Sequence, residues 1–163
     1  MYVLEASLKA ALQDFVVCEA RLCDESRYAE WEALWAEDGA YWVPCGTGDY
    51  DPAEQLSHIY DNRKRIHTRV QQLATGFRYS QVPPSPMRRL LTSFEFSVEN
   101  DRFHLAANFF LPEYSIQAVH DFRIWSGCVH YVLSRREASF QMHLKKVVLV
   151  NGNEPIPTLS FLI

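Results

Sequence analysis

The first apolar pattern along the chain has the period of an α-helix. Between residues 4 and 22, apolar side chains recur every three or four positions, at Leu4, Leu8, Leu12, Phe15, Cys18 and Leu22. This spacing places them on one stripe of a helix, which must be buried against the rest of the protein. We therefore expect a long amphipathic helix in this part of the chain.

A second, shorter helix is expected after Asp24, whose side chain can cap its first turn. Its buried face would hold the aromatic residues Tyr28, Trp31 and Trp35. The pair Asp38-Gly39 is a typical helix end. A brief strand at residues 41–43 follows and ends at Pro44.

The clearest helix start in the sequence is at residues 51–54. Asp51 can act as a cap, Pro52 suits the first helical position, and Glu54 supplies an acid in the first turn. This predicts a third helix that ends at Gly76, with a buried face formed by Leu56, Ile59, Ile66, Val70 and Leu73.

After the proline-rich segment 83–86, the pattern changes to alternation. Phe94, Phe96 and Val98 share one side of an extended strand, and residues 99–101 form a turn. Further long strands are expected at 103–111, 119–134 (with Gly127 as a bulge) and 140–150. Helices followed by antiparallel strands predict a single α+β domain over residues 1–163, with three helices on one face of a strongly curved sheet.

Composition limits the function classes. The chain has 163 residues, of which 48% are hydrophobic and 22% charged, as in ordinary globular domains. The longest apolar runs are four residues, which excludes a membrane span, and no signal-peptide pattern begins the sequence. The four cysteines are too scattered for a disulfide framework. We expect reduced thiols and a cytoplasmic location.

Charge is unevenly distributed along the chain. Residues 1–61 contain 3 Lys/Arg and 13 Asp/Glu, whereas residues 62–94 contain seven basic residues, six of them Arg, and no acid. This basic segment is either a solvated face or a docking surface for an acidic partner, since Arg suits bidentate pairing at interfaces. Nucleic acid is a less suitable partner, because the rest of the chain repels phosphate and carries no binding motif.

The sequence contains no established catalytic motif and no complete metal site. Cys128-Val129-His130 matches only the first half of a Rieske iron–sulfur signature, and no cysteine follows to complete it. His104, His130 and His143 fall in separate expected strands, but no acid obviously joins them to form an iron site. We assign no catalytic, metal-binding or cofactor-binding residue.

A curved sheet covered by helices can enclose an apolar pocket, which leaves one enzymatic alternative. Asp38, Tyr41 and His104 are its candidate cavity residues, since a desolvated carboxyl with a raised pKa could shuttle a proton there. The simpler interpretation is that Asp38 ends a helix, Tyr41 begins a strand and His104 faces solvent.

The order of several short segments resembles the small (β) subunit of aromatic-ring-hydroxylating dioxygenases. The resemblance begins with residues 19–24, Tyr28, Trp31, Trp35 and the strand Trp42-Val43-Pro44. It continues through Ile59-Tyr60-Asp61-Asn62-Arg63, Arg69, Pro83-Pro84-Ser85 and Arg88-Arg89-Leu90, and ends with Leu149-Val150-Asn151 and Leu159-Ser160-Phe161. It covers nearly the whole chain.

The resemblance implies a cone-shaped fold like nuclear transport factor 2 and the ketosteroid isomerases. It also implies a larger α subunit that carries a Rieske [2Fe–2S] cluster and a mononuclear Fe(II), receives electrons from NAD(P)H and adds O2 to an aromatic ring. The β subunit would have no cofactor of its own and would build an α3β3 assembly, or a β trimer when alone.

Within this interpretation, the candidate partner contacts come from the acid-free segment: Arg63, Arg65, Arg69, Arg88 and Arg89. Two alternatives stay open. One is a stand-alone dehydratase or isomerase of the same fold, and the other is a homo-oligomeric module that binds a small apolar ligand.

Overall fold

The computed structural model describes residues 4–75, 83–116 and 120–163. These residues form three helices and six strands. The elements are α1 (Ala6–Asp24), α2 (Tyr28–Ala33), β1 (Trp35–Pro44), β2 (Ser57–Asn62), α3 (Arg63–Ala74), β3 (Leu90–Glu99), β4 (Arg102–Ser115), β5 (Asp121–Arg136) and β6 (Ser139–Leu149). No helix among them is long and apolar enough to cross a membrane.

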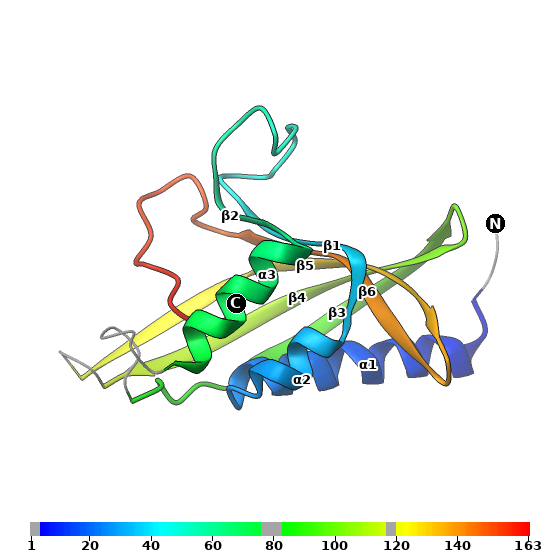
Figure 1. Cartoon of the computed structure of the whole chain (residues 1–163), viewed down its shortest axis with the longest axis horizontal. Coiled ribbons are helices and arrows are strands. Elements are labelled where there is room, and N and C mark those ends of the chain that lie inside the picture. Colours follow the sequence, from blue (N-terminus) through cyan, green and yellow to red (C-terminus); the bar gives the residue numbers. More distant parts are fainter. Residues whose placement is uncertain (1–3, 76–82, 117–119) are drawn as a thin grey trace.

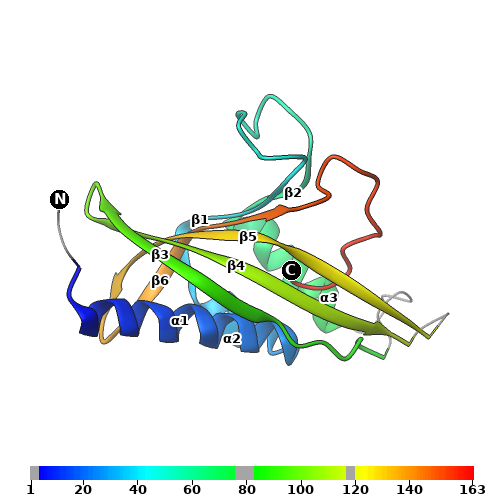
Figure 2. The same cartoon turned by 180° about the vertical axis from the view of Figure 1, so that it is seen from behind.

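The strands make one curved sheet in the order β2-β1-β6-β5-β4-β3. β1 runs parallel to β6, and every other neighbouring pair is antiparallel. All three helices lie on one side of this sheet (Figure 1), and the view from behind shows β3, β4 and β5 in front of α3 (Figure 2). The predicted α+β architecture with helices on one face is confirmed.

The core lies between the helices and the sheet face that they cover, which we call the inner face. α1 buries Leu12, Phe15 and Leu22 of the predicted apolar stripe. Cys18, which the stripe also placed on the buried side, is exposed, whereas Val16 is buried. The long strands bury alternate residues toward these helices, including Leu105, Ala107, Phe109, Leu111, Val129, Tyr131, Leu133, Val147 and Leu149. The opposite, outer face is not covered by any described helix.

The prediction for the second helix was wrong at both ends. Asp24 is the last residue of α1 and gives α2 no cap, because α2 begins after Arg27 without a side-chain cap. Trp35 begins β1 instead of continuing the helix. β1 is ten residues long, since its pairing with β2 and β6 extends it well beyond the brief strand expected at 41–43.

The third helix begins later than predicted. The Asp51 carboxylate does accept the Ala53 N–H at 2.8 Å, but it closes only a local turn. Residues 57–62 then pair with β1 as the antiparallel strand β2, and the helix begins at Arg63, with Asn62 Oδ1 accepting the Arg65 N–H. Ile59, Ile66, Val70 and Leu73 are buried, whereas Leu56 is 90% exposed. Gly76 lies outside the described residues.

In the second half, the strands and the first turn follow the prediction. Asn100 and Asp101 both have positive φ and connect β3 to β4, as a tight two-residue hairpin requires. Val119, the predicted start of the next strand, lies outside the described residues. Gly127 is not a bulge, because it pairs in register with both Phe109 and Leu149. A Cβ there would lie 1.9 Å from the Val148 carbonyl oxygen, so close backbone approach explains the glycine.

Candidate functional site

The centre of the protein holds a buried ionic cluster. Glu19 on α1 and Lys145 on β6 are 0% and 1% exposed in their side chains, and Lys145 Nζ lies 2.8 Å from Glu19 Oε1. Trp31 Nε1 donates to Oε1 at 2.6 Å, and the Tyr131 hydroxyl donates to Oε2 at 2.9 Å. The Cys23 thiol donates to Oε1 at 3.3 Å. Oε1 therefore accepts from three donors and Oε2 from the Tyr131 hydroxyl.

The environment fixes the protonation of this buried ionic cluster. Burial alone would raise the pKa of Glu19, but Lys145, Arg89 and the hydrogen bonds hold that pKa below its ordinary value. Burial would lower the pKa of Lys145, yet the neighbouring Cys23 and Glu19 keep it raised. Burial, followed by Glu19, raises the pKa of Cys23 to about 12. The cluster is thus an ion pair beside a protonated thiol, with no group ready to exchange a proton near neutral pH.

The chain segment 159–163 completes the filling of the interior. Leu159, Phe161, Leu162 and Ile163 are all buried. The Tyr41 hydroxyl accepts the Ile163 N–H at 3.0 Å and donates to the Ile163 carbonyl oxygen at 2.9 Å. The space under the cone is therefore occupied by side chains of the protein itself.

The structure does not bring the three cavity candidates together. Tyr41 is fully buried on the inner face, in the contact with Ile163. His104 lies on the outer face, in an open groove that also includes Glu95, His130 and Lys146. Asp38 is 65% exposed, and its carboxylate contacts His143 instead.

The candidate arginines fall into two groups. Three are paired with carboxylates of the same chain: Arg63 with Glu32 at 2.8 Å, Arg69 with Asp61 at 2.5 Å and Arg89 with Asp24 at 2.8 Å. Arg89 is only 4% exposed and also donates to the Leu162 carbonyl oxygen. Arg65 and Arg88 project outward, with Arg88 71% exposed and 3.9 Å from Glu25.

One end of the outer face carries exposed apolar side chains. Leu90 pairs with Phe110 across β3 and β4, and Ile124 pairs with Pro112 and Phe122 with Tyr114 across β4 and β5. Directly paired residues share a face of the sheet. The exposed fractions are 60% for Leu90, 46% for Phe110, 71% for Phe122 and 65% for Ile124. We call these four residues the outer apolar patch; such contiguous patches mark interaction surfaces.

Metal-ligand geometry is not found in the part of the chain that the structure describes. No group of three or more His, Cys, Asp or Glu side chains there could hold a metal ion. His104 and His130 line the same outer groove, but burial, followed by Lys146, lowers the pKa of His130. Cys128 is a free thiol on the same face.

Sequence reasoning missed the buried ionic cluster, although two signals point to it. Glu19 is a charged residue on the helical stripe formed by Phe15, Val16 and Leu22. Lys145 takes the core-facing place in the alternation that continues with Val147 and Leu149. Opposite charges at two core positions predict a buried pair, because neither ion could be buried alone.

Comparisons with known proteins give one consistent result. The family model described as "Ring hydroxylating beta subunit" matches residues 18–153. The biphenyl 2,3-dioxygenase subunit beta of Rhodococcus jostii (strain RHA1) is 24% identical over 171 residues, which cover 97% of this chain and 90% of that protein.

Solved structures show the same fold. The beta subunit of a benzoate 1,2-dioxygenase from Burkholderia mallei has a TM-score of 0.75 and 21% identity, covering 99% of this chain and all of the other. A chain of naphthalene 1,2-dioxygenase, solved with indole bound in the active site, has a TM-score of 0.82 and 14% identity, covering 100% and 89%. The expected cone-shaped architecture is confirmed.

Proposed function

The chain belongs to the ring-hydroxylating beta subunit family, and from that premise we propose that it is the non-catalytic, assembly-forming subunit of an aromatic-ring-hydroxylating dioxygenase. The observation that carries this role is the filled interior. Glu19, Lys145, Tyr41 and segment 159–163 fill the space between the helices and the sheet, where the enzymatic alternative would need a pocket. A protein of this build contributes through its surface.

The partner in this proposal is a larger α subunit. That subunit holds the Rieske [2Fe–2S] cluster and the mononuclear Fe(II), and its reaction uses electrons from NAD(P)H. This chain supplies no ligand to either centre, in keeping with the absence of a suitable donor group among its described residues. The four free thiols suit a reducing compartment, and we place the complex in the cytoplasm.

For the assembly, we propose an α3β3 hexamer whose β subunits contact one another through the outer apolar patch. Arg88 lies beside this patch, in a groove shared with Met87, Pro112, Tyr114 and Phe122. The matching surface is the acid-rich first third of a neighbouring copy, since residues 1–61 carry 13 acids and 3 bases. A patch that binds a different surface of the next copy generates a ring when the rotation between copies closes, here after three copies.

Of the candidate arginines, Arg65 and Arg88 are the contacts that we propose for partners. Both side chains reach solvent, whereas Arg63, Arg69 and Arg89 are paired within the chain. An arginine already held by an internal carboxylate must give up that pairing to bind another chain. When Arg65 and Arg88 bind another chain, they do not have to break a buried ion pair like those of Arg63, Arg69 and Arg89.

The test is affinity capture of the tagged chain from its native cells, followed by light scattering, mass analysis and a visible spectrum. We expect a larger, brown, iron–sulfur-containing companion at a one-to-one ratio, and a mass equal to three pairs. His104→Ala should leave dioxygenase turnover of this complex unchanged, because His104 lies in an open outer groove. A colourless protein that is captured alone would contradict the proposal.

A further inference from the structure

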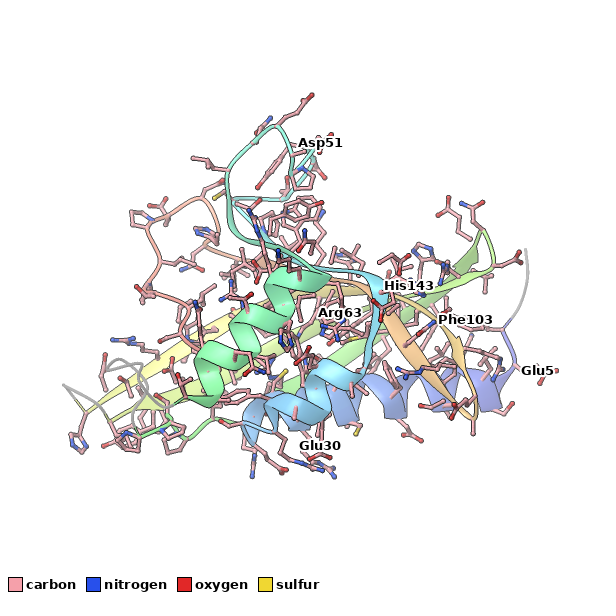
Figure 3. The ribbon with its side chains drawn as sticks, viewed as in Figure 1. Glu5, Glu30, Asp51, Arg63, Phe103 and His143 are labelled. Atoms are coloured by element: carbon pink, nitrogen blue, oxygen red, sulfur yellow. The ribbon has the colours of Figure 1, made fainter. Side chains whose placement is uncertain are left out.

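The β1–β2 loop, residues 45–56, stands away from the body of the protein. It joins two strands at one edge of the sheet, and Figure 1 shows it projecting beyond both of them. Figure 3 shows Asp51 near the far end of this loop. The outer apolar patch lies toward the opposite edge, because its residues belong to β3, β4 and β5. The loop and the patch are therefore separate surfaces.

Hydrogen bonds hold this loop in one shape. The Tyr50 hydroxyl accepts the Cys45 N–H at 2.9 Å and donates to the Leu56 carbonyl oxygen at 3.0 Å, so it ties the two ends of the loop together. Lys146 Nζ donates to the Gly48 carbonyl oxygen at 3.1 Å and fixes the loop to β6. A binding surface that is already ordered loses little conformational entropy when a partner binds.

The loop exposes a large aliphatic side chain beside a hollow. Leu56 is 90% exposed, the largest exposed fraction among the large hydrophobic side chains of the described residues. A hollow of about 630 Å³ opens next to it between the loop and Asn153, and it is also lined by Cys45, Tyr50 and Gln55. Single exposed leucines are common, but one that stands on an ordered, projecting loop beside a hollow is suited to insertion into a partner.

The charge around Leu56 is entirely negative. Residues 45–56 contain Asp49, Asp51 and Glu54 and no Lys or Arg, and residues 150–158, which follow β6, add Glu154 and again no base. All four acids are exposed, and none takes part in the ion pairs of the described residues. We call Leu56 and these four acids the loop surface. Such a surface fits a partner that is basic around an apolar pocket.

A second copy of the chain is a poor match for the loop surface. Each copy has a net charge of -4. The groove beside its outer apolar patch offers one arginine, Arg88, together with the acids Asp24 and Glu25. A neighbouring copy therefore neutralises only part of the four negative charges, and a more basic chain is better suited to this surface.

We propose that the loop surface is the docking site for the larger subunit of the complex, which meets it with Lys or Arg side chains around an apolar pocket that takes up Leu56. This inference rests on the proposed function, which supplies the larger subunit, and it adds the part of this chain that binds that subunit. The outer apolar patch then joins copies of this chain, and the loop surface joins the two kinds of subunit.

Two substitutions of exposed residues test the site, in tagged chains captured from the native cells. Leu56→Asp removes the apolar anchor, and we expect it to lower the yield of the brown, iron–sulfur-containing companion by about tenfold or more. Glu54→Lys reverses one charge and should lower that yield by about threefold or more at low salt, with a smaller effect at high salt. Glu99→Lys is the matched control, since it makes the same charge change at an exposed position of β3, at the opposite edge of the sheet, and should keep the native yield.

Light scattering of the purified variants separates the two kinds of contact. We expect all three variants to keep the oligomer of the native chain, and if one loop variant does not fold, the other decides. Loss of the oligomer in the folded loop variants would assign the loop surface to a neighbouring copy and overturn the proposal. A native yield of the companion in these variants would also overturn it, while the proposed function would stand. If even the native chain captures no companion, the proposed function fails together with this inference.

Discussion

The ammonium group of Lys145 lies 2.8 Å from Glu19 Oε1, and both side chains are almost completely shielded from water. Burying either ion by itself would cost several kcal/mol. Their pairing, together with the donors from Trp31 and Tyr131, makes the burial tolerable. The contact also ties α1 to β6, two elements far apart in the sequence.

Removal of one partner should therefore be severe. Lys145→Met leaves the Glu19 carboxylate buried without its counter-ion, and we expect a loss of about 3–5 kcal/mol in the free energy of unfolding. Urea denaturation followed by tryptophan fluorescence measures it. Glu30→Gln, in the exposed pair with Arg27, is the control and should change little. A Lys145→Met variant as stable as the native chain would refute this account.

A double-mutant cycle tests the coupling of the same two residues. Glu19→Gln leaves Lys145 unpaired, while Glu19→Gln with Lys145→Met removes both charges. We expect the double variant to lose less stability than the sum of the two single losses, by about 0.5–3 kcal/mol. Additive losses would mean that the two ions do not stabilise each other.

Stability should fall at both ends of the pH range. The lowered pKa of Glu19 contributes stability that is present above its unfolded value of 4.5 and is lost as the pH falls through the folded pKa. The raised pKa values of Cys23 and Lys145 mean that the folded chain holds protons that the unfolded chain releases. Their contribution is therefore lost as the pH rises.

Cys23 gives this alkaline limb a specific test. The pKa of Cys23 is about 12 in the folded chain against an ordinary 9.0. Between these two pH values, the free energy of unfolding should therefore fall by up to about 1.4 kcal/mol per pH unit because of this thiol. Denaturation of Cys23→Ala at pH 8 to 11 should show a shallower decline than the native chain. Cys18→Ala, which removes an exposed thiol, serves as the control. Identical slopes in all three proteins would contradict the prediction.

Gly127→Ala should be destabilising through a backbone clash. The added methyl group would lie 1.9 Å from the Val148 carbonyl oxygen, so β5 and β6 would have to separate. We expect a loss of about 1–3 kcal/mol or more, measured by thermal denaturation. Ser126→Ala, at the neighbouring position of β5, should be nearly neutral.

Charge reversal should separate two adjacent arginines. Arg89→Glu would bury a second carboxylate beside that of Asp24, with no positive charge between them. We expect this variant not to fold stably. Arg88→Glu changes a side chain that is 71% exposed and should keep the fold. In the assembly that we propose, Arg88→Glu weakens association between chains, more strongly at low salt than at high salt. If the Arg88→Glu chains associate equally well at low and high salt, Arg88 is not part of the interface.

The outer apolar patch should govern self-association. Phe122→Asp and Ile124→Asp change side chains that are 71% and 65% exposed, so folding should be preserved. Light scattering should show that these variants lose the oligomer formed by the native chain. Leu56→Asp, at an exposed apolar residue of the loop before β2, should leave the oligomer intact. An unchanged oligomer in both patch variants would place the contact elsewhere.

Local sequence patterns predicted the elements that local physics decides. The apolar stripe of α1 and the alternation of β4 and β6 reflect burial of one side of each element, and both were correct except at Cys18, which is exposed. The start of the third helix failed, because residues 57–62 are drawn into a strand by β1, a tertiary contact that a helix-cap signal cannot reveal. The same long-range pairing converts Trp35 from a helical residue to a strand residue.

Candidate chemistry was harder to predict than the fold. Asp38 was singled out as an acid, but its partner is His143, not His104. The contact exists because the sheet bulges on both sides of His143, and no short sequence window encodes where two strands lose register. The charge pattern identified the basic segment, yet internal acids such as Asp24 and Asp61 neutralise part of it.

The parallel pair of β1 and β6 has a consequence for how the protein folds. It joins residues near position 40 to residues near position 145, so the sheet closes only after nearly the whole chain has been made. Such distant contacts cost loop entropy before they add stability, which slows folding. The helical half, which contains β1, and the strands β3 to β6 each lack a neighbouring strand of the sheet when the other half is absent. The protein should therefore fold late and as one cooperative unit, and fragments cut between Gln72 and Pro83 should not be stable alone.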